Sequence, residues 1–353
     1  GQVSGRRNIV INGAMNVAQR SASVADLGAA GGFFTLDRFA FVIGGSAGRL
    51  TMSQTAITDL SGFSNALKLD CTTADTSIAS SEVMMIRYAF EGQDVQQFKK
   101  GTSDAEKITV SFYVKGNASA TYTCELQDNT NGRTIAQAFS VTTSFTRVIL
   151  TFNADTSGTL VSDNAARFRL HFLLHSGSDW NGGTFVSNTW ESTTTNKRIA
   201  DDTTSFFDST DRTFFLTGVQ MEVGSAATPF EHRSYGEELA LCQRYYHHWS
   251  AVDGSNTFKP LWVGGLAKSA TRADFFIPAP VVMRAAPTLT ASADLFQIGD
   301  GTVGNVTSAM GQAGLTKEGV VAKATTTGLT VGRCVNIYAD DNNTAYIEFD
   351  AEL

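Results

Sequence analysis

The chain has 353 residues, of which 42% are hydrophobic and 17% are charged, and its net charge is −7. This much apolar surface excludes disorder along most of the chain, and the length favours two packed units over one. Lys and Arg cluster no further than pairs, so binding to nucleic acid is not expected, and no apolar run approaches the ~20 residues that membrane insertion requires.

The composition also favours strands over helices. Gly is frequent, with 32 residues, and Pro is scarce, with 5, so we expect an all-β fold of short strands and small turns. The four cysteines are spaced too widely for a zinc or redox motif, and we expect reduced core residues of a protein made in a cytosol. Because the first residue is Gly, we expect a trimmed or processed chain, or the end of a longer one.

The first part of the sequence predicts an arm followed by a β-sandwich. Residues 1–32 are rich in Gly, Ala and Ser, and their apolar stretch at 8–13 is too short to form a core alone, so we expect a docking arm. Between 33 and 233, apolar and polar side chains alternate in strand-length segments separated by turns, most clearly at 108–114 and 168–174. This pattern predicts an antiparallel sandwich over 33–233.

The pattern changes after the sandwich. Between 234 and 250, apolar and aromatic side chains recur every three or four residues, and Ser234 and Glu237 have the spacing of a capping box. We therefore predict a short linking helix over 234–250. Alternation resumes afterwards, which predicts a smaller C-terminal β domain over 251–353, with the Gly-rich stretch 299–332 as a loop or exposed tip.

The sequence predicts no catalytic residue, no cofactor and no metal site. Residues 44–48 match the G-x-S-x-G pattern of serine hydrolases, but a strand-like segment follows them where a helix is required, so we expect a hairpin turn. His171 and His175 could share one face of a strand, yet no third ligand is visible. His247 and His248 are expected on the surface of the predicted helix. We therefore expect a binding protein and not an enzyme.

Four residues in one turn-rich connection are candidates for glycan binding: Asp179, Trp180, Asn181 and Trp190. The apolar C–H faces of sugar rings stack on indole rings, and sugar hydroxyls form hydrogen bonds with Asp and Asn side chains. Trp180 fits this description best. The alternative is that Trp180 folds back and caps the sandwich core, which is the more common role of a tryptophan in a loop.

Several blocks of the sequence resemble tail-fibre and related surface proteins of tailed bacteriophages. They are Asn8–Arg20, Thr35–Phe39, Leu216–Gly224, Ala227–Glu231, Glu237–Tyr246, Met283–Thr288 and Phe349–Leu353. The resemblance implies a jelly-roll domain similar to carbohydrate-binding modules, a short helix and a distal β domain. It also implies a homotrimer in the virion, an N-terminal arm that contacts other tail or baseplate proteins, and adhesion to a bacterial surface polysaccharide.

Three functions are compatible with these features. The favoured one is a phage tail fibre, a receptor-binding protein that attaches the virion to host surface glycans without cleaving them. One alternative is a structural virion component such as a head spike, collar or connector protein. The other is a polysaccharide depolymerase tailspike that uses paired carboxylates. The sequence has no parallel β-helix repeat or long coiled-coil shaft, so a short terminal adhesin fits better.

Overall fold

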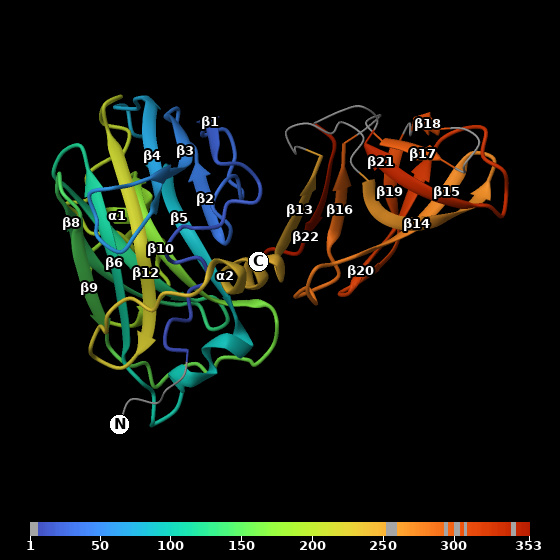
Figure 1. Ribbon diagram of the computed structural model, residues 1–353. Coiled ribbons are helices and arrows are strands. Elements are labelled where there is room, and N and C mark those ends of the chain that lie inside the picture. The colour runs from blue at the N-terminus through green and yellow to red at the C-terminus, as the bar shows by residue number, and fades with distance from the viewer. Residues whose placement is uncertain (1–5, 252–259, 293–295, 300–303, 307–308, 340–343) are drawn as a thin grey trace. The chain divides into compact units, whose positions relative to one another are not determined.

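The computed structural model describes residues 6–251, 260–292, 296–299, 304–306, 309–339 and 344–353. It has 46% of its residues in strands and 7% in helices, which confirms the predicted all-β class. The chain divides into two compact units, with the boundary after Glu238 (Figure 1). In the described part of the chain, no helix has the length and apolar character that a membrane span requires.

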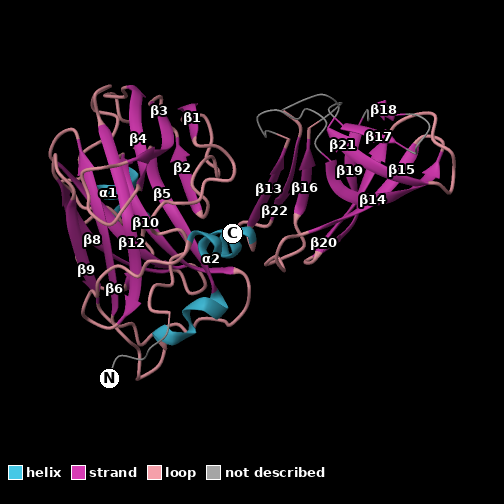
Figure 2. Cartoon of the chain, in the orientation of Figure 1, coloured by secondary structure: helices cyan, strands magenta, loops and turns pink. Residues whose placement is uncertain are grey.

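Two six-stranded antiparallel sheets form the first unit (Figure 2). Sheet A has the order β1-β3-β4-β12-β6-β9, with strands Ser23–Leu27, Arg49–Ala56, Asn65–Thr73, Thr213–Val223, Ile108–Gly116 and Thr146–Phe152. Sheet B has the order β11-β8-β7-β10-β5-β2, with strands Glu191–Ser192, Arg133–Val141, Ala120–Asp128, Ala166–Ser176, Val83–Glu91 and Phe39–Gly44. The short helices are η1 (Gly92–Phe98), α1 (Ser178–Asn181) and η2 (Thr195–Lys197). The chain crosses repeatedly between the sheets, as in a jelly-roll sandwich.

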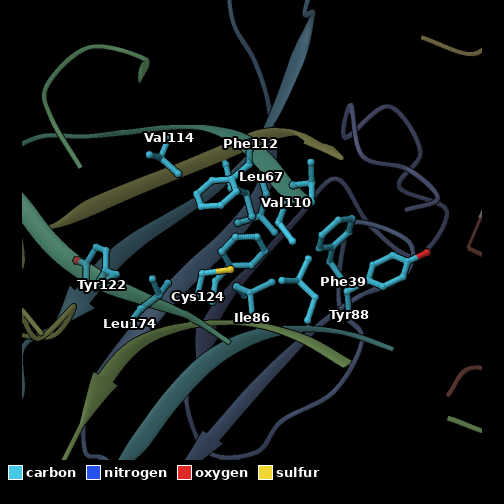
Figure 3. Packing of buried hydrophobic residues seen from close by; sticks show 14 of the residues in the cluster. Phe39, Leu67, Ile86, Tyr88, Val110, Phe112, Val114, Tyr122, Cys124 and Leu174 are labelled. Atoms are coloured by element: carbon cyan, nitrogen blue, oxygen red, sulfur yellow. The ribbon is translucent and has the colours of Figure 1, made fainter. Parts of the chain in front are cut away.

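An apolar core fills the space between sheets A and B (Figure 3). Alternate side chains of β6 and β10 are buried as predicted: Ile108, Val110, Phe112, Val114, Phe168, Leu170, Phe172 and Leu174. Phe112 packs edge-to-face against Phe139 and Phe172, with ring centroids 5.1 and 5.0 Å away. The intervening polar residues of the same strands therefore face outward.

The N-terminal segment belongs to this core. Val10 and Met15 are fully buried, and Asn8 Nδ2 donates a hydrogen bond to the carbonyl oxygen of Val219 at 3.1 Å. The predicted docking arm over 1–32 is therefore wrong for residues 8–17. Strand β1 belongs to the sandwich as well, because it pairs with β3. A segment too short to form a core alone is stabilised here by β12, which lies far along the sequence.

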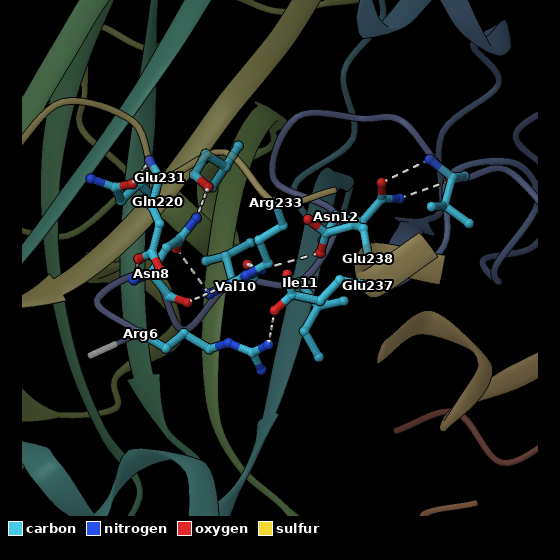
Figure 4. A network of polar contacts seen from close by, with 12 residues as sticks. Arg6, Asn8, Val10, Ile11, Asn12, Gln220, Glu231, Arg233, Glu237 and Glu238 are labelled. Carbon is cyan, nitrogen blue, oxygen red and sulfur yellow. Dashed lines mark hydrogen bonds and ion pairs between the residues drawn. The ribbon is translucent and has the colours of Figure 1, made fainter. Parts of the chain in front are cut away.

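Polar contacts hold the N-terminal segment against the residues that follow β12 (Figure 4). Glu231 accepts a hydrogen bond from the backbone N–H of Asn8 at 2.7 Å. Glu238 accepts one from the backbone N–H of Asn12 at 2.6 Å and another from Arg233 Nη1 at 3.1 Å. Sequence blocks that carry the phage resemblance thus meet in one network, and these residues stabilise the fold.

The glycine-rich stretch 44–48 crosses from one sheet to the other and is not the predicted hairpin turn. β2 pairs with β5 in sheet B, whereas β3 pairs with β4 in sheet A. Gly45 adopts a φ of +76°, which glycine reaches without strain. Ser46 Oγ donates a hydrogen bond to Asp75 Oδ2 at 2.9 Å, so the hydroxyl fixes the crossing.

The helix α2 (Tyr235–Gln243) is shorter than predicted. Ser234 Oγ accepts a hydrogen bond from the backbone N–H of Glu237 at 3.3 Å, which is one half of the expected capping box. The helix prediction over 234–250 is wrong at its end, because Tyr246–Ser250 form strand β13. β13 pairs with β22 (Tyr346–Asp350), and this distant pairing overrides the helical spacing of the aromatic residues.

The second unit also contains two antiparallel sheets. One has the order β13-β22-β16, with β16 at Thr288–Ala291. The other has the order β18-β17-β21-β14-β15-β20-β19, with strands Gly304–Val306, Phe296–Gly299, Cys334–Ala339, Pro260–Ser269, Arg272–Pro278, Gly319–Thr325 and Ala309–Thr316. The predicted loop at 299–332 is wrong for residues 309–325, which form the β19–β20 hairpin; 300–303 and 307–308 lie outside the described residues.

The cysteines are mostly core residues. Cys71, Cys124 and Cys242 are buried, as predicted. Cys334 is exposed on β21, so the core prediction is wrong at that position.

His247 lies on β13 opposite Phe349, and not on a helix surface as predicted. Its Nδ1 is buried without a hydrogen-bond partner among the described residues. Burial, with a smaller contribution from the charge of His248, lowers the pKa of His247 to about 4. The unfolded chain, in which the value is near 6.5, then binds more protons than the folded chain. We expect the second unit to lose stability as the pH falls from 6.5 towards about 4.

An NMR titration of the His247 ring measures this pKa directly. His247→Phe should reduce the pH dependence of unfolding in this range, because the titrating group is gone. The control is His232→Phe, which changes an exposed histidine of the first unit and should leave the dependence in place. A His247 pKa near 6.5 would contradict the prediction.

Candidate functional site

The outer face of sheet B carries a group of charged side chains. Because the apolar residues of β5, β7 and β10 alternate towards the core, Arg87, Glu125 and His171 point outward. The strand register places His171 opposite Glu125 on one side and opposite Arg87 on the other. Arg169 lies two residues before His171 and therefore faces the same way.

The connection between β10 and β12 folds over part of this face. One of its contacts with the sheet is a small apolar cluster of Val83, Met85, Leu173 and Ile199. Trp180, from α1, packs against this cluster. The cluster anchors the connection on the sheet, and Arg198, which precedes Ile199, is thereby held over Glu125.

Glu125 and Arg198 form a buried ion pair beside the apolar cluster. Arg198 Nε donates to Glu125 Oε2 at 2.7 Å, Arg198 Nη2 donates to Oε1 at 2.5 Å, and His171 Nδ1 lies 2.7 Å from the same Oε1. Burial alone would raise the pKa of Glu125, but hydrogen bonds and charge from Arg198 and His171 outweigh it, and the net pKa is lowered. Glu125 is therefore ionised at neutral pH. The guanidinium carbon of Arg198 also lies 4.9 Å from the ring centroid of Trp180, a cation–π contact.

Arg87 and Arg169 lie near this ion pair and have no carboxylate partner among the described residues. Among the described residues, the Arg87 side chain forms no hydrogen bond, ion pair or ring contact. Arg169 forms one long side-chain hydrogen bond, which its Nη1 donates to Gln127 Oε1 at 3.4 Å. Arg169 Nε is buried without an acceptor. Burial lowers the pKa of both guanidinium groups, and the charges of Arg87 and Arg198 lower that of Arg169 further. Arginine nevertheless stays protonated at neutral pH, so two positive charges remain without a counterion.

The predicted glycan-binding residues fall into two places. Asp179, Trp180 and Asn181 lie together on α1, at the outer face of sheet B; Asp179 is exposed, whereas Trp180 and Asn181 are half-buried. Trp190 is not with them. Its ring packs against the core between the sheets, and its Nε1 donates a hydrogen bond to the carbonyl oxygen of Asn153 at 2.7 Å.

Sequence reasoning missed Arg87, Arg169 and Arg198 as residues of the candidate site. A signal existed for Arg169, because it alternates with apolar residues in a predicted strand and therefore faces outward. Arg87 lies within the apolar run 83–90, where no alternation marks it. Its proximity to Arg169 follows from strand pairing, which no local pattern reveals.

A hollow of about 340 Å³ beside η1 is a second candidate in the first unit. Lys99 and Lys100 line it. Lys99 pairs with Glu106 at 2.8 Å, and Lys100 is buried against Asp128 at 2.5 Å. Both cations of this hollow are therefore neutralised within the protein, unlike Arg87 and Arg169.

His171 and His175, which could have shared a strand face, have separate partners. His175 Nε2 lies 2.9 Å from Glu82 Oε2, and its Nδ1 lies 2.8 Å from Ser205 Oγ. Across the ranges that the structure covers, no group of three or more His, Cys, Asp or Glu side chains is arranged to hold a metal ion. His171 contacts the neighbouring strand β7, whereas His175 ties the connection that contains Ser205 to β10.

No protein-family model matches the sequence, and a comparison with curated proteins finds no match. Similar solved structures include the enzymatically active domain of bacteriophage CBA120 tailspike protein 4, at 10% identity over 61% of this chain and 21% of that chain, with a TM-score of 0.30. They also include the N-terminal cellulose-binding domain of Cellulomonas fimi β-1,4-glucanase C, at 15% identity over 53% of this chain and 90% of that chain, with a TM-score of 0.28.

A third similar structure is TmCBM61 in complex with β-1,4-galactotriose, at 8% identity over 62% of this chain and 99% of that chain, with a TM-score of 0.31. The present chain thus spans about a fifth of the tailspike chain but nearly all of the binding modules. Because these TM-scores are low, the fold of the chain is defined by its own strand order and not by the similar structures.

Proposed function

We propose that this chain is a tail fibre of a tailed bacteriophage, a receptor-binding protein that attaches the virion to host surface glycans through the outer face of sheet B. The observation that carries this proposal is the pair Arg87 and Arg169, which have no carboxylate partner among the described residues and lie near the Trp180–Arg198 contact. Side chains with unused donors beside an aromatic ring are suited to a ligand rich in hydroxyl and other acceptor groups. The sequence blocks supply the phage context.

Binding without cleavage fits the chemistry of Glu125. A glycosidase needs one carboxylic acid with a raised pKa as proton donor and a second carboxylate near it. Glu125 has a lowered pKa, and both of its oxygens accept hydrogen bonds from Arg198. It therefore holds Arg198 in place and does not supply a proton.

The proposal includes the location and assembly of the protein. We infer that it is made in the host cytoplasm, becomes part of the phage tail and forms a homotrimer that contacts other virion proteins. The small core of the second unit gives assembly a physical motive, because small domains gain stability from association. A native mass measurement should give three copies, and a stable monomer would contradict this part.

Adsorption of the intact protein to host cells, and its retention by fractionated envelope polysaccharide, test the proposal directly. We expect saturable binding to a polysaccharide fraction without release of reducing ends. Failure to bind any host envelope fraction would contradict it. Release of reducing ends would instead favour the depolymerase, and electron microscopy that places the protein in the head or collar would favour a structural component.

A further inference from the structure

We propose that Arg87 and Arg169 bind an oxyanion substituent of the glycan, a sugar carboxylate or a phosphate, so that the receptor is an acidic polysaccharide. This inference rests on the proposed function and specifies the ligand of the same site. A neutral glycan would leave both guanidinium groups without a counterion.

The net charge of the group formed by Arg87, Arg169, Arg198 and Glu125 differs in sign from that of the whole protein. Glu125 is the one carboxylate of this group, which leaves an excess of two positive charges. Burial lowers the pKa of His171, and its hydrogen bond to Glu125 does not offset this, so the ring is neutral and adds no charge to the group. The protein as a whole carries −7 and repels a polyanion at long range. Attraction of an acidic glycan must therefore come from this local group of arginines.

The two arginines are placed so that one ligand group can contact both. They lie on the neighbouring strands β5 and β10, on the same face, and are diagonal to each other because Arg87 is opposite His171. Diagonal neighbours on adjacent strands lie about 7–8 Å apart, within the reach of two long side chains. A guanidinium presents a planar fork of donors that matches the paired oxygens of a carboxylate or a phosphate.

The lack of a carboxylate partner among the described residues separates these arginines from two lysines on the opposite side of the sandwich. On sheet A, Lys68 pairs with Asp70 at 2.7 Å, and Lys115 pairs with Asp59 at 2.6 Å. A partly buried cation without a counterion costs stability, and an apolar residue of similar length would serve packing better. The two unpaired arginines are therefore accounted for by a ligand and not by the fold.

Affinity electrophoresis of the full chain tests this inference with defined probes: polygalacturonate, its carboxyl-reduced neutral product and poly(glycerol phosphate). We expect retardation by the first or the third polymer, weakening as salt is added, and none by the neutral product. The double variant Arg87→Met/Arg169→Met should bind about 10- to 100-fold more weakly, the range expected for loss of a charge-assisted hydrogen bond. Which polyanion is retained distinguishes a carboxylate from a phosphate.

The matched control is Arg272→Met, which removes one positive charge from the second unit, where Arg272 pairs with Asp274 at 2.7 Å. It should leave retardation unchanged. The double variant should unfold at the same temperature as the parent or a higher one, because it removes two unpaired charges, so weaker binding would not reflect unfolding. Equal retardation of parent and double variant, or equal binding to the carboxyl-reduced polymer, would overturn the inference.

The experiments distinguish a failure of this inference from a failure of the proposed function. Binding to host polysaccharide that persists in the double variant leaves the adhesin in place and overturns the anion site. Calorimetric titration with glucuronate and with inorganic phosphate tests the arginines without a host polysaccharide. Anion binding that the double variant loses, together with no binding to any host fraction, would support the anion site and overturn the adhesin.

Discussion

Arg198→Met is expected to lower the free energy of unfolding of the first unit by about 3–5 kcal/mol, the range for breaking a buried ion pair from one side. The side chains of Arg198 and Glu125 are 10% and 0% exposed. Without the guanidinium, Glu125 stays buried with His171 as its remaining polar partner. Urea unfolding at neutral pH, followed by circular dichroism, measures the loss.

The pH dependence identifies the cause of this loss. In the parent, the lowered pKa of Glu125 means that its stabilising contribution is present above the ordinary value of 4.5 and is lost as the pH falls through the folded value. In the variant, Arg198 no longer offsets burial and only His171 does, so we expect the folded pKa to rise above the unfolded one and protonation to favour the folded state. The difference between parent and variant should therefore shrink as the pH falls towards 4.5.

Asp59→Asn is the matched control, since it breaks an ion pair whose carboxylate is 51% exposed. Exposed pairs contribute no more than about 1 kcal/mol, because water screens them. If Asp59→Asn and Arg198→Met lowered the free energy of unfolding by similar amounts, this would contradict the assignment of Glu125–Arg198 as a buried, strongly stabilising ion pair.

The sequence predicted those parts of the fold whose burial has a local cause. Alternation along 108–114 and 168–174 identifies β6 and β10 because each strand has one face on the core. Helical spacing at 234–250 predicts α2 correctly at its start, where Ser234 caps it. The prediction fails at 246–250 because pairing with β22, about a hundred residues later, decides that segment.

Residues whose partners are distant in sequence could not be predicted in this way. Asn8 is buried because Val219 and Glu231 contact it, and the short apolar stretch around it carries no sign of either. The same limit applies to the residues of the candidate site. Trp180 was identifiable from its turn-rich neighbours, whereas the positions of Arg87 and Arg169 beside each other depend on the register of β5 and β10.

Phe112→Ala is expected to destabilise the first unit by about 3–5 kcal/mol, because the removed ring leaves a cavity that a rigid core refills incompletely. Phe112 is fully buried, and its edge-to-face contacts with Phe139 and Phe172 join residues of both sheets. Thermal and urea unfolding measure the change. Ile149→Ala, on the neighbouring strand β9, is the control: Ile149 is 51% exposed, so its loss should stay within about 0.5 kcal/mol. Equal effects of the two substitutions would mean that the apolar faces of sheets A and B do not pack as the alternation of their strands requires.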